Sequence, residues 1–434
     1  MRPLAWTILY ALVAGPMFAE DERAPYAFYP MSGIVGKDVF LTYAVDLDST
    51  SGIRDFDCSQ YTYNGHRGID VTLESFRQQD IGMPVFAALD GTVVATHDGD
   101  EFDRRLDGGG NSAGNAVVLR HKGTHMTRYF HLRNGSVAVV PGQFVTAGTQ
   151  LGLAASSGTS SWPHLHFQSE YEGAHYEPSA GPCREGPSYW TNPNQVLLER
   201  SFHAGEFGFS SEAYEVPATR ESLAEDRQAR TGTYVHGSTI HYRLTMRNVP
   251  PQTSSQMRLR RPDGTIAVTR NQAYGNAALL RLFMTRGSFD LEADVLGLWR
   301  LEIAFNGATM VTAPFLVVAS SSEIENRAPH AIGASIKPAN LTVNDVPRCE
   351  VETSLLFEDP DYDVIRYRYE WFVGDRLVRD VTSGGLMDAL PRDAARPGDR
   401  ITCRVTPSDG MLEGPTATAE GKVALLLRRR AVAH

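Results

Sequence analysis

Four histidines and one aspartate lie in three short stretches between residues 65 and 170. Imidazole and carboxylate groups are the side chains from which catalytic zinc sites are made, with three protein ligands and an open position for water. Two further polar groups would then be left to serve that water. The pattern therefore predicts a hydrolytic metal site. The three stretches are Gly65-His66-Arg67-Gly68-Ile69-Asp70, Tyr129-Phe130-His131-Leu132 and Trp162-Pro163-His164-Leu165-His166-Phe167.

The elements that position these residues can be inferred from their spacing. His164 and His166 alternate with Leu165 and Phe167, and residues two apart on a strand point to the same face. Both imidazoles should therefore face one place while the apolar partners face the core. Taken alone, a His-x-His pair also fits a polar strand face, and His66-x-x-x-Asp70 also arises by chance. Glycines at 65 and 68 indicate a turn that enters a strand rather than a helix.

The joint order of these stretches resembles the lysostaphin-like zinc metallopeptidases, the M23 or LytM-type family. That family has His-x-x-x-Asp, a glycine-rich hairpin region, Tyr-x-His-Leu and then Pro-His-Leu-His-Phe. The resemblance covers residues 65–170 and continues more loosely to Asn192-Pro193, and the rest of the chain lies outside it. The segments between the motifs match too: Pro84–Ala88, Asp90–Val94, Gly114–Val118, Pro141–Val145 and Gly148–Gly152.

The resemblance implies a division of labour among the site residues. His66, Asp70 and His166 would bind one Zn²⁺. His131 and His164 would be the unligated catalytic pair, one taking the proton of the metal-bound water and the other stabilising the oxyanion or serving the leaving amine. Which histidine is the base stays open. Substrate contacts are expected at Tyr61, Tyr63 and Asn115, although the tyrosines also fit aromatic residues that pack at the rim.

The N-terminus and the overall charge bear on location and partners. Residues 1–19 read as a secretory signal peptide with Arg2 in its charged region and cleavage near Ala19. No later segment is long and apolar enough to span a membrane, so the mature chain is expected to be secreted to the periplasm, cell envelope or exterior. The net charge of −10 leaves no basic stripe for phosphates, which disfavours nucleic acid as a partner.

The fold is expected to be mainly β. An antiparallel β-sheet domain of the M23 type should occupy 20–203, because residues 66–170 show a period of two and no helical period. Two β-sandwich domains of the immunoglobulin-like type should follow at 204–320 and 327–423, where short strands alternate with turns. Cys349, Trp371 and Cys403 have the order typical of the second sandwich.

Four cysteines in an exported chain should form disulfides, and they allow three pairings. Pairing within domains gives Cys58–Cys183 and Cys349–Cys403. Aspartates at 359, 361 and 363 raise the alternative of a Ca²⁺-binding turn against a plain acidic turn. An EF-hand loop is not complete there, because Val364 stands where that loop needs glycine. The calcium candidates are Asp359, Asp361 and Asp363.

The function expected from these features is that of an exported zinc metalloendopeptidase. Its substrate would be a peptide, most simply a peptidoglycan cross-link or stem peptide. One alternative is a non-catalytic binding or regulatory protein on the same fold, but all five site positions are filled here, which favours the enzyme. The other alternative is a secreted peptidase that acts on proteins. The two sandwiches are expected to be spacers or surface-binding modules, with catalysis confined to the first domain.

Overall fold

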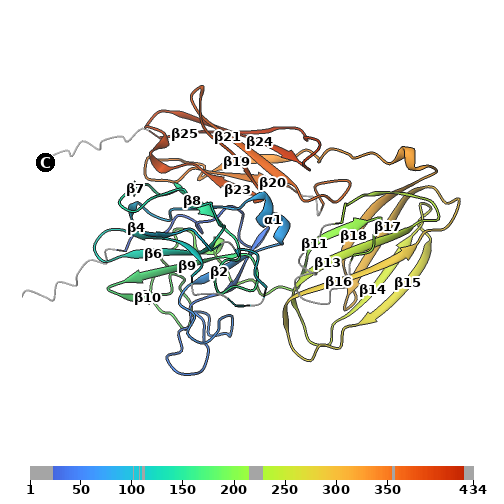
Figure 1. The fold of residues 1–434 in the computed structure, drawn as a ribbon, viewed down its shortest axis with the longest axis horizontal. Coiled ribbons are helices and arrows are strands. Elements are labelled where there is room, and N and C mark those ends of the chain that lie inside the picture. Colours follow the sequence, from blue (N-terminus) through green and yellow to red (C-terminus); the bar gives the residue numbers. More distant parts are fainter. Residues whose placement is uncertain are drawn as a thin grey trace, which may run out of the picture.

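The chain folds into three groups of strands that follow one another along the sequence (Figure 1). The structure, a computed structural model, describes residues 23–100, 102–106, 108–109, 113–214, 228–353 and 357–424. The predicted mainly β fold with antiparallel sheets is confirmed. The predicted signal peptide lies outside the described residues. Within those residues, no helix is long and apolar enough to cross a membrane.

The N-terminal part, residues 23–198, contains an eight-stranded sheet in the order β1-β2-β9-β6-β5-β4-β7, with β10 paired to β9, and a separate β3–β8 pair. A six-residue helix, α1, interrupts the strands, and the side chain of its N-cap residue, Ser75, accepts a hydrogen bond from the Gln78 amide. The sequence indicated no helix here, because six residues are too few to show a helical period. The elements are β1 (Val39–Tyr43), β2 (Ile69–Leu73), α1 (Phe76–Ile81), β3 (Pro84–Phe86), β4 (Gly91–His97), β5 (Asn115–Arg120), β6 (Met126–Leu132), β7 (Phe144–Val145), β8 (Gln150–Leu153), β9 (His164–Tyr171) and β10 (Ala174–Tyr176).

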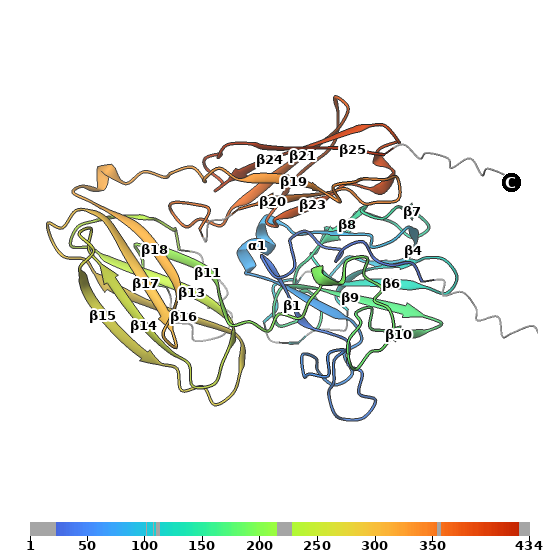
Figure 2. The ribbon, with the colours of Figure 1, turned by 180° about the vertical axis from the view of Figure 1, so that it is seen from behind.

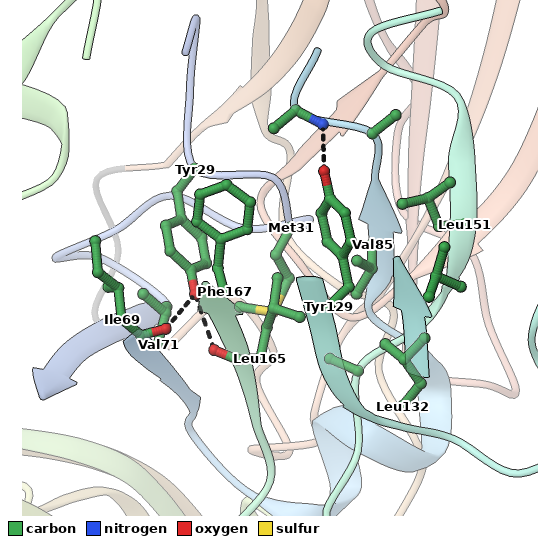
Figure 3. Packing of buried hydrophobic residues seen from close by; sticks show 14 of the residues in the cluster. Tyr29, Met31, Ile69, Val71, Val85, Tyr129, Leu132, Leu151, Leu165 and Phe167 are labelled. Atoms are coloured by element: carbon green, nitrogen blue, oxygen red, sulfur yellow. Dashed lines mark hydrogen bonds between the residues drawn. The ribbon is translucent and has the colours of Figure 1, made fainter. Parts of the chain in front are cut away.

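The core of the N-terminal part lies on one face of β2 and β9. Leu165 and Phe167 are buried in it, at 0% and 1% exposure, as the alternation in the sequence predicted. Tyr29 comes from the segment before β1, and its hydroxyl lies 3.1 Å from the Ile69 carbonyl oxygen and 2.8 Å from that of Leu165 (Figure 3). One phenol therefore bridges both strands from the core side and leaves their other face for the histidines.

The middle sandwich, residues 203–318, consists of a three-stranded sheet, β11-β13-β16, and a five-stranded sheet, β12-β18-β17-β14-β15. Of the strands the structure describes, β12 and β18 alone pair in parallel. Side chains from both sheets form one apolar core that includes Trp299. Its strands are β11 (His203–Ser210), β12 (Thr233–Val235), β13 (Thr239–Val249), β14 (Ser254–Arg260), β15 (Ile266–Ala273), β16 (Leu280–Asp290), β17 (Gly297–Phe305) and β18 (Ala308–Val318).

The C-terminal sandwich, residues 333–422, pairs a three-stranded sheet, β19-β20-β23, with a four-stranded sheet, β22-β21-β24-β25. The structure joins Cys349 of β20 to Cys403 of β24 across its core, next to the buried Trp371. The immunoglobulin-like assignment and the three domain boundaries stay predictions. The strands are β19 (Gly333–Lys337), β20 (Arg348–Glu352), β21 (Arg366–Val373), β22 (Arg376–Ser383), β23 (Met387–Ala389), β24 (Arg400–Ser408) and β25 (Ala417–Lys422).

The C-terminal sandwich lies along one side of the N-terminal part, as both views show (Figures 1 and 2). An apolar cluster spans the contact and joins Phe28 and Phe86 to Val346 and Met387. The side-chain amide of Gln78 donates to the Gly384 carbonyl at 3.1 Å. A linked spacer module would need no such buried contacts, so this sandwich is docked on the N-terminal part.

Asp38 links these two parts through its carboxylate. One oxygen accepts the Ile34 amide at 2.6 Å and the other accepts the Leu386 amide at 2.7 Å. Burial raises the pKa of Asp38 to about 7, the two amide donors oppose that rise, and the charge of Glu358 adds to it. An aspartate in the unfolded chain titrates near pH ~4. The folded state therefore binds more protons between these two values, and its stability should fall as pH rises through that window.

Replacing Asp38 with asparagine tests this linkage. The substituted amide carries no charge in either state, so the fall in unfolding temperature between pH 5 and pH 8 should be smaller in Asp38→Asn than in the wild type. Thermal unfolding followed by circular dichroism measures it. Asp263→Asn is the control, because hydrogen bonds to Thr265 lower the pKa of Asp263, so that this group does not titrate between pH 5 and pH 8. An equal fall in Asp38→Asn and wild type would contradict the prediction.

Candidate metal centre

The pairing of β2 with β9 brings two predicted ligands together. Asp70 lies directly opposite His166 in this antiparallel pair, and Thr72 lies opposite His164. Residues directly opposite each other point to the same face of a sheet. The register therefore places the carboxylate and both imidazoles on the face away from the core.

His66 reaches the same place from the turn before β2. The His66 amide donates to the Tyr63 carbonyl at 3.0 Å, which closes a four-residue turn, and Gly65 takes φ 76° inside it. Positive φ at this position is the reason a turn of this kind needs glycine. The Asp46 carboxylate holds the turn further by accepting the Gly65 amide at 2.9 Å. The ring of His66 is thereby fixed, with 2% of the residue exposed.

His66, Asp70 and His166 converge on one point. His66 Nε2 lies 3.2 Å from His166 Nδ1 and 3.2 Å from Asp70 Oδ1, and His166 Nδ1 lies 2.8 Å from the same oxygen. Ligands about 2.0–2.1 Å from a tetrahedral ion are separated by roughly 3.3 Å. Within the described residues, this is the sole cluster of His, Cys, Asp and Glu whose atoms could jointly hold a metal ion.

The protonation of the ligands also fits a cation. His66 Nδ1 donates to the Ala44 carbonyl at 2.7 Å, so Nε2 is the nitrogen that faces the shared point and could bind a cation there. Burial would raise the pKa of Asp70, but its interactions with the imidazoles of His66, His164 and His166 hold that pKa well below its usual range. The carboxylate is therefore ionised, and three donor atoms with lone pairs meet where a cation would satisfy them together.

Gly68 keeps the space beside His166 open. A Cβ built on Gly68 would lie 2.5 Å from His166 Nε2 and 2.8 Å from the Phe167 carbonyl oxygen. A real Cβ essentially never lies this close to another heavy atom, so the ring would have to move. On its other side His166 stacks on Phe130, with ring centroids 5.4 Å apart and planes 7° apart. The ring is held from two sides in the orientation that points Nδ1 at Asp70.

His131 and His164 stand next to this cluster, their ring centroids 4.5 Å apart. His131 Nδ1 donates to the Ser157 carbonyl at 2.7 Å and His164 Nδ1 donates to the Trp162 carbonyl at 2.8 Å, which leaves Nε2 of each ring unprotonated. Burial lowers the pKa of both, and for His131 the neighbouring His164 and His166 lower it further. Both rings are therefore neutral near pH 7 and can accept a proton.

The backbone at His131 takes an unusual conformation, with φ 63°. Its amide donates to the Ala113 carbonyl at 3.0 Å and its carbonyl accepts the Ala155 amide at 3.0 Å, so the conformation is held from both sides. A left-handed residue near the end of β6 breaks the strand alternation, and His131 and Leu132 are both buried in consequence.

The predicted substrate contacts fall in different surroundings. Tyr63 is 49% exposed and stacks on His66, with centroids 4.3 Å apart, so it stands at the mouth of the site. Tyr61 lies under the guanidinium of Arg281 of β16, which is 3.5 Å from its ring centroid. Tyr61 therefore has part of its ring covered by the middle sandwich.

The side chain of Asn115 makes its hydrogen bonds within the protein and is not presented to a substrate. It is fully buried, at 0% exposure. Its side-chain oxygen accepts the amides of Gly99 and Asp100, and its nitrogen donates to the carbonyls of Asp100 and Leu132. All four hydrogen-bonding positions are used within the chain. The expectation of a substrate contact is therefore corrected: Asn115 fixes the loop after β4 next to the end of β6.

The acidic turn proposed as a calcium alternative has other partners. Asp361 accepts the Gly232 amide and forms an ion pair with Arg327 at 2.8 Å. Asp359 Oδ1 accepts the Asp361 amide at 2.7 Å and the Asp363 amide at 3.3 Å. These contacts are those of a turn that joins the two sandwiches, and the three carboxylates do not converge as calcium ligands.

Sequence reasoning missed the groups that orient the histidines. The carbonyls of Ala44, Ser157 and Trp162 each accept an Nδ1 proton, but main-chain acceptors leave no mark in a side-chain pattern. Of the three residues that supply these carbonyls, Trp162 alone lies in a stretch that the sequence analysis singled out, two residues before His164.

Comparison with known proteins adds to this geometry. Residues 64–178 match the model of Peptidase family M23. ShyA of Vibrio cholerae, a peptidoglycan DD-endopeptidase, is 36% identical over 103 residues, which are 24% of this chain and 20% of ShyA. ShyB, a second peptidoglycan DD-endopeptidase of Vibrio cholerae, is 34% identical over 157 residues, 35% of this chain and 31% of ShyB. Lysostaphin of Staphylococcus staphylolyticus is 29% identical over 195 residues, 42% of this chain and 37% of lysostaphin. The chain therefore spans well under half the length of these relatives.

Metal content should distinguish alanine variants of the three converging residues, His66, Asp70 and His166, from alanine variants of the neighbouring histidine pair. Alanine at His66, Asp70 or His166 should abolish tight binding of a divalent metal, because each would supply one of three ligands. Alanine at His131 or His164 should leave near-stoichiometric metal. Elemental analysis of the dialysed full-length protein measures this, with His175→Ala on exposed β10 as control. Metal lost from His131→Ala but kept in His166→Ala would reverse the assignment.

Proposed function

Residues 64–178 belong to peptidase family M23, and we propose that the chain is an exported zinc endopeptidase that hydrolyses peptide cross-links or stem peptides of peptidoglycan. The observation that carries this proposal is the convergence of His66, Asp70 and His166 beside two neutral histidines. Two imidazoles and one carboxylate form a mixed nitrogen and oxygen set that suits zinc. The names of ShyA and ShyB, both peptidoglycan DD-endopeptidases, support the substrate class.

The residues divide the chemistry as follows. His66 through Nε2, Asp70 through Oδ1 and His166 through Nδ1 would hold the zinc. When bound, the ion would supply Lewis-acid chemistry that polarises the scissile carbonyl and activates a water. His131 and His164 present unprotonated Nε2 atoms, so the pair can take the proton of the attacking water and return it to the leaving amine. Once protonated, either ring can also stabilise negative charge on the carbonyl oxygen.

Export is part of the proposal. The disulfides Cys58–Cys183 and Cys349–Cys403 support it, because such bonds persist in oxidising compartments. Cys58–Cys183 ties the segment before the His66 turn to the loop after β10, so it brackets the site. The signal peptide proposed at residues 1–19 would direct the chain there.

Turnover should depend on the histidine pair in a way that metal content does not. His131→Ala or His164→Ala should lower kcat on a defined cross-linked muropeptide by about 10²–10⁴-fold, the range for losing an acid–base group. Quantifying the products by mass spectrometry gives the rate and identifies the bond. His175→Ala should retain the wild-type rate.

Two outcomes would count against the proposal. Unchanged kcat in both His131→Ala and His164→Ala would remove the proposed acid–base roles. Casein incubated in parallel tests the substrate class: a wild-type protein that cleaves casein and no muropeptide would be a general peptidase rather than a wall enzyme.

A further inference from the structure

Arg247 of β13 reaches out of the middle sandwich to the end of β2. It is buried, with 2% exposed, and its Nη1 donates to Thr72 Oγ1 at 3.0 Å while its Nη2 donates to the Leu73 carbonyl at 2.7 Å. Its guanidinium also covers the ring of Phe40 of β1, 4.5 Å from the centroid, and lies 3.7 Å from the Glu74 carboxylate. A buried guanidinium is strongly constrained in orientation by such acceptors and contacts.

The Leu73 carbonyl is the link to the site, because it accepts a second hydrogen bond. Trp162 Nε1 donates to the same oxygen at 2.9 Å, and the Leu73 amide donates to the Pro163 carbonyl at 2.9 Å. The carbonyl of Trp162 in turn accepts the Nδ1 proton of His164 at 2.8 Å. Three hydrogen bonds therefore connect the guanidinium of Arg247 to the imidazole of His164.

A second contact between the same two parts supports the tryptophan. Leu282 and Met284 of β16 pack against an apolar cluster formed by Phe76, Leu106 and Trp162. The middle sandwich therefore packs on the apolar cluster that contains Trp162, while the N–H of Trp162 binds the same Leu73 carbonyl that Arg247 binds. The middle sandwich contacts the support of His164 at two independent points.

We propose that Arg247 is a positioning residue for His164, and that the middle sandwich is part of the machinery that holds this histidine in its working tautomer. The position of the Trp162 carbonyl decides where the Nδ1 proton of His164 is bound, and so which nitrogen faces the substrate. Without Arg247, the Leu73 carbonyl and Thr72 lose a buried donor, and the Trp162 loop can shift. The expected effect on catalysis rests on the proposed function, whereas the effect on the hydrogen bond does not.

The test uses the full-length, zinc-loaded protein with selectively ¹⁵N-labelled histidine. The Nδ1–H signal of His164 is identified by its absence in His164→Ala. Arg247→Met, which keeps an apolar stem, and Trp162→Phe, which removes the N–H link together with part of the ring, should each shift or broaden that signal. The Nδ1–H signal of His131 should not change, because it donates to the Ser157 carbonyl outside this chain of bonds.

The matched control is Arg348→Met. Arg348 is also a buried arginine between two parts of the protein, 7% exposed, and it donates to the Ala27 carbonyl at 3.3 Å, but it belongs to the C-terminal sandwich. It should leave both imidazole signals and kcat unchanged. Arg247→Met and Trp162→Phe should lower kcat by about 10–100-fold, with zinc content near one per chain, which is the usual range for losing an outer partner of a site.

The outcomes separate this inference from the proposed function. An unchanged His164 Nδ1–H signal in both Arg247→Met and Trp162→Phe would overturn the positioning role even if the wild type cleaves muropeptides. The same shift or broadening of the His164 signal in Arg348→Met would also overturn it, because the change would then report a general loosening of the protein. A wild type that cleaves no peptide, with the signals changing as expected, would overturn only the proposed function.

Discussion

The register between β2 and β9 is the constraint on which the candidate site depends. Asp70 stands opposite His166 and Thr72 opposite His164, so a slip of one residue would turn one strand's ligand toward the core. The core side secures that register, since the Tyr29 hydroxyl lies within hydrogen-bonding distance of carbonyls on both strands. The apolar core residues and the candidate metal ligands thus occupy opposite faces of one strand pair, and neither set can be shifted without the other.

The parts of the site that could be predicted from the sequence are those marked by a residue pattern within a few positions. His164 and His166 alternate with apolar neighbours, and the glycines around His66 mark a turn, so the strand that carries both imidazoles and the turn before Asp70 were predictable from local spacing. The division of these residues into ligands and a catalytic pair came from the family resemblance. Asn115 could not be placed this way. An asparagine near a predicted site has the right chemistry for substrate, but its burial depends on a loop fifteen residues earlier in the chain.

Contacts between the three parts were beyond the reach of the sequence for the same reason. Each sandwich has a turn pattern that identifies it as β, yet nothing in that pattern tells which face meets another part. Buried arginines such as Arg247 and Arg348 look like surface residues until the tertiary structure surrounds them. The sandwiches were expected to be spacers or surface-binding modules, whereas the structure packs one beside the support of His164 and the other along the N-terminal part.

The left-handed backbone at His131 has a consequence for reading mutational data on this protein. Such a conformation costs about 1–3 kcal/mol for most residues, and histidine, asparagine and aspartate tolerate it better than β-branched side chains. Two separate requirements therefore restrict the residue type at this position: the left-handed backbone and the chemistry of the imidazole. In a saturation scan, a valine at this position would lose function for steric reasons before chemistry was tested, whereas an asparagine would isolate the loss of the proton acceptor.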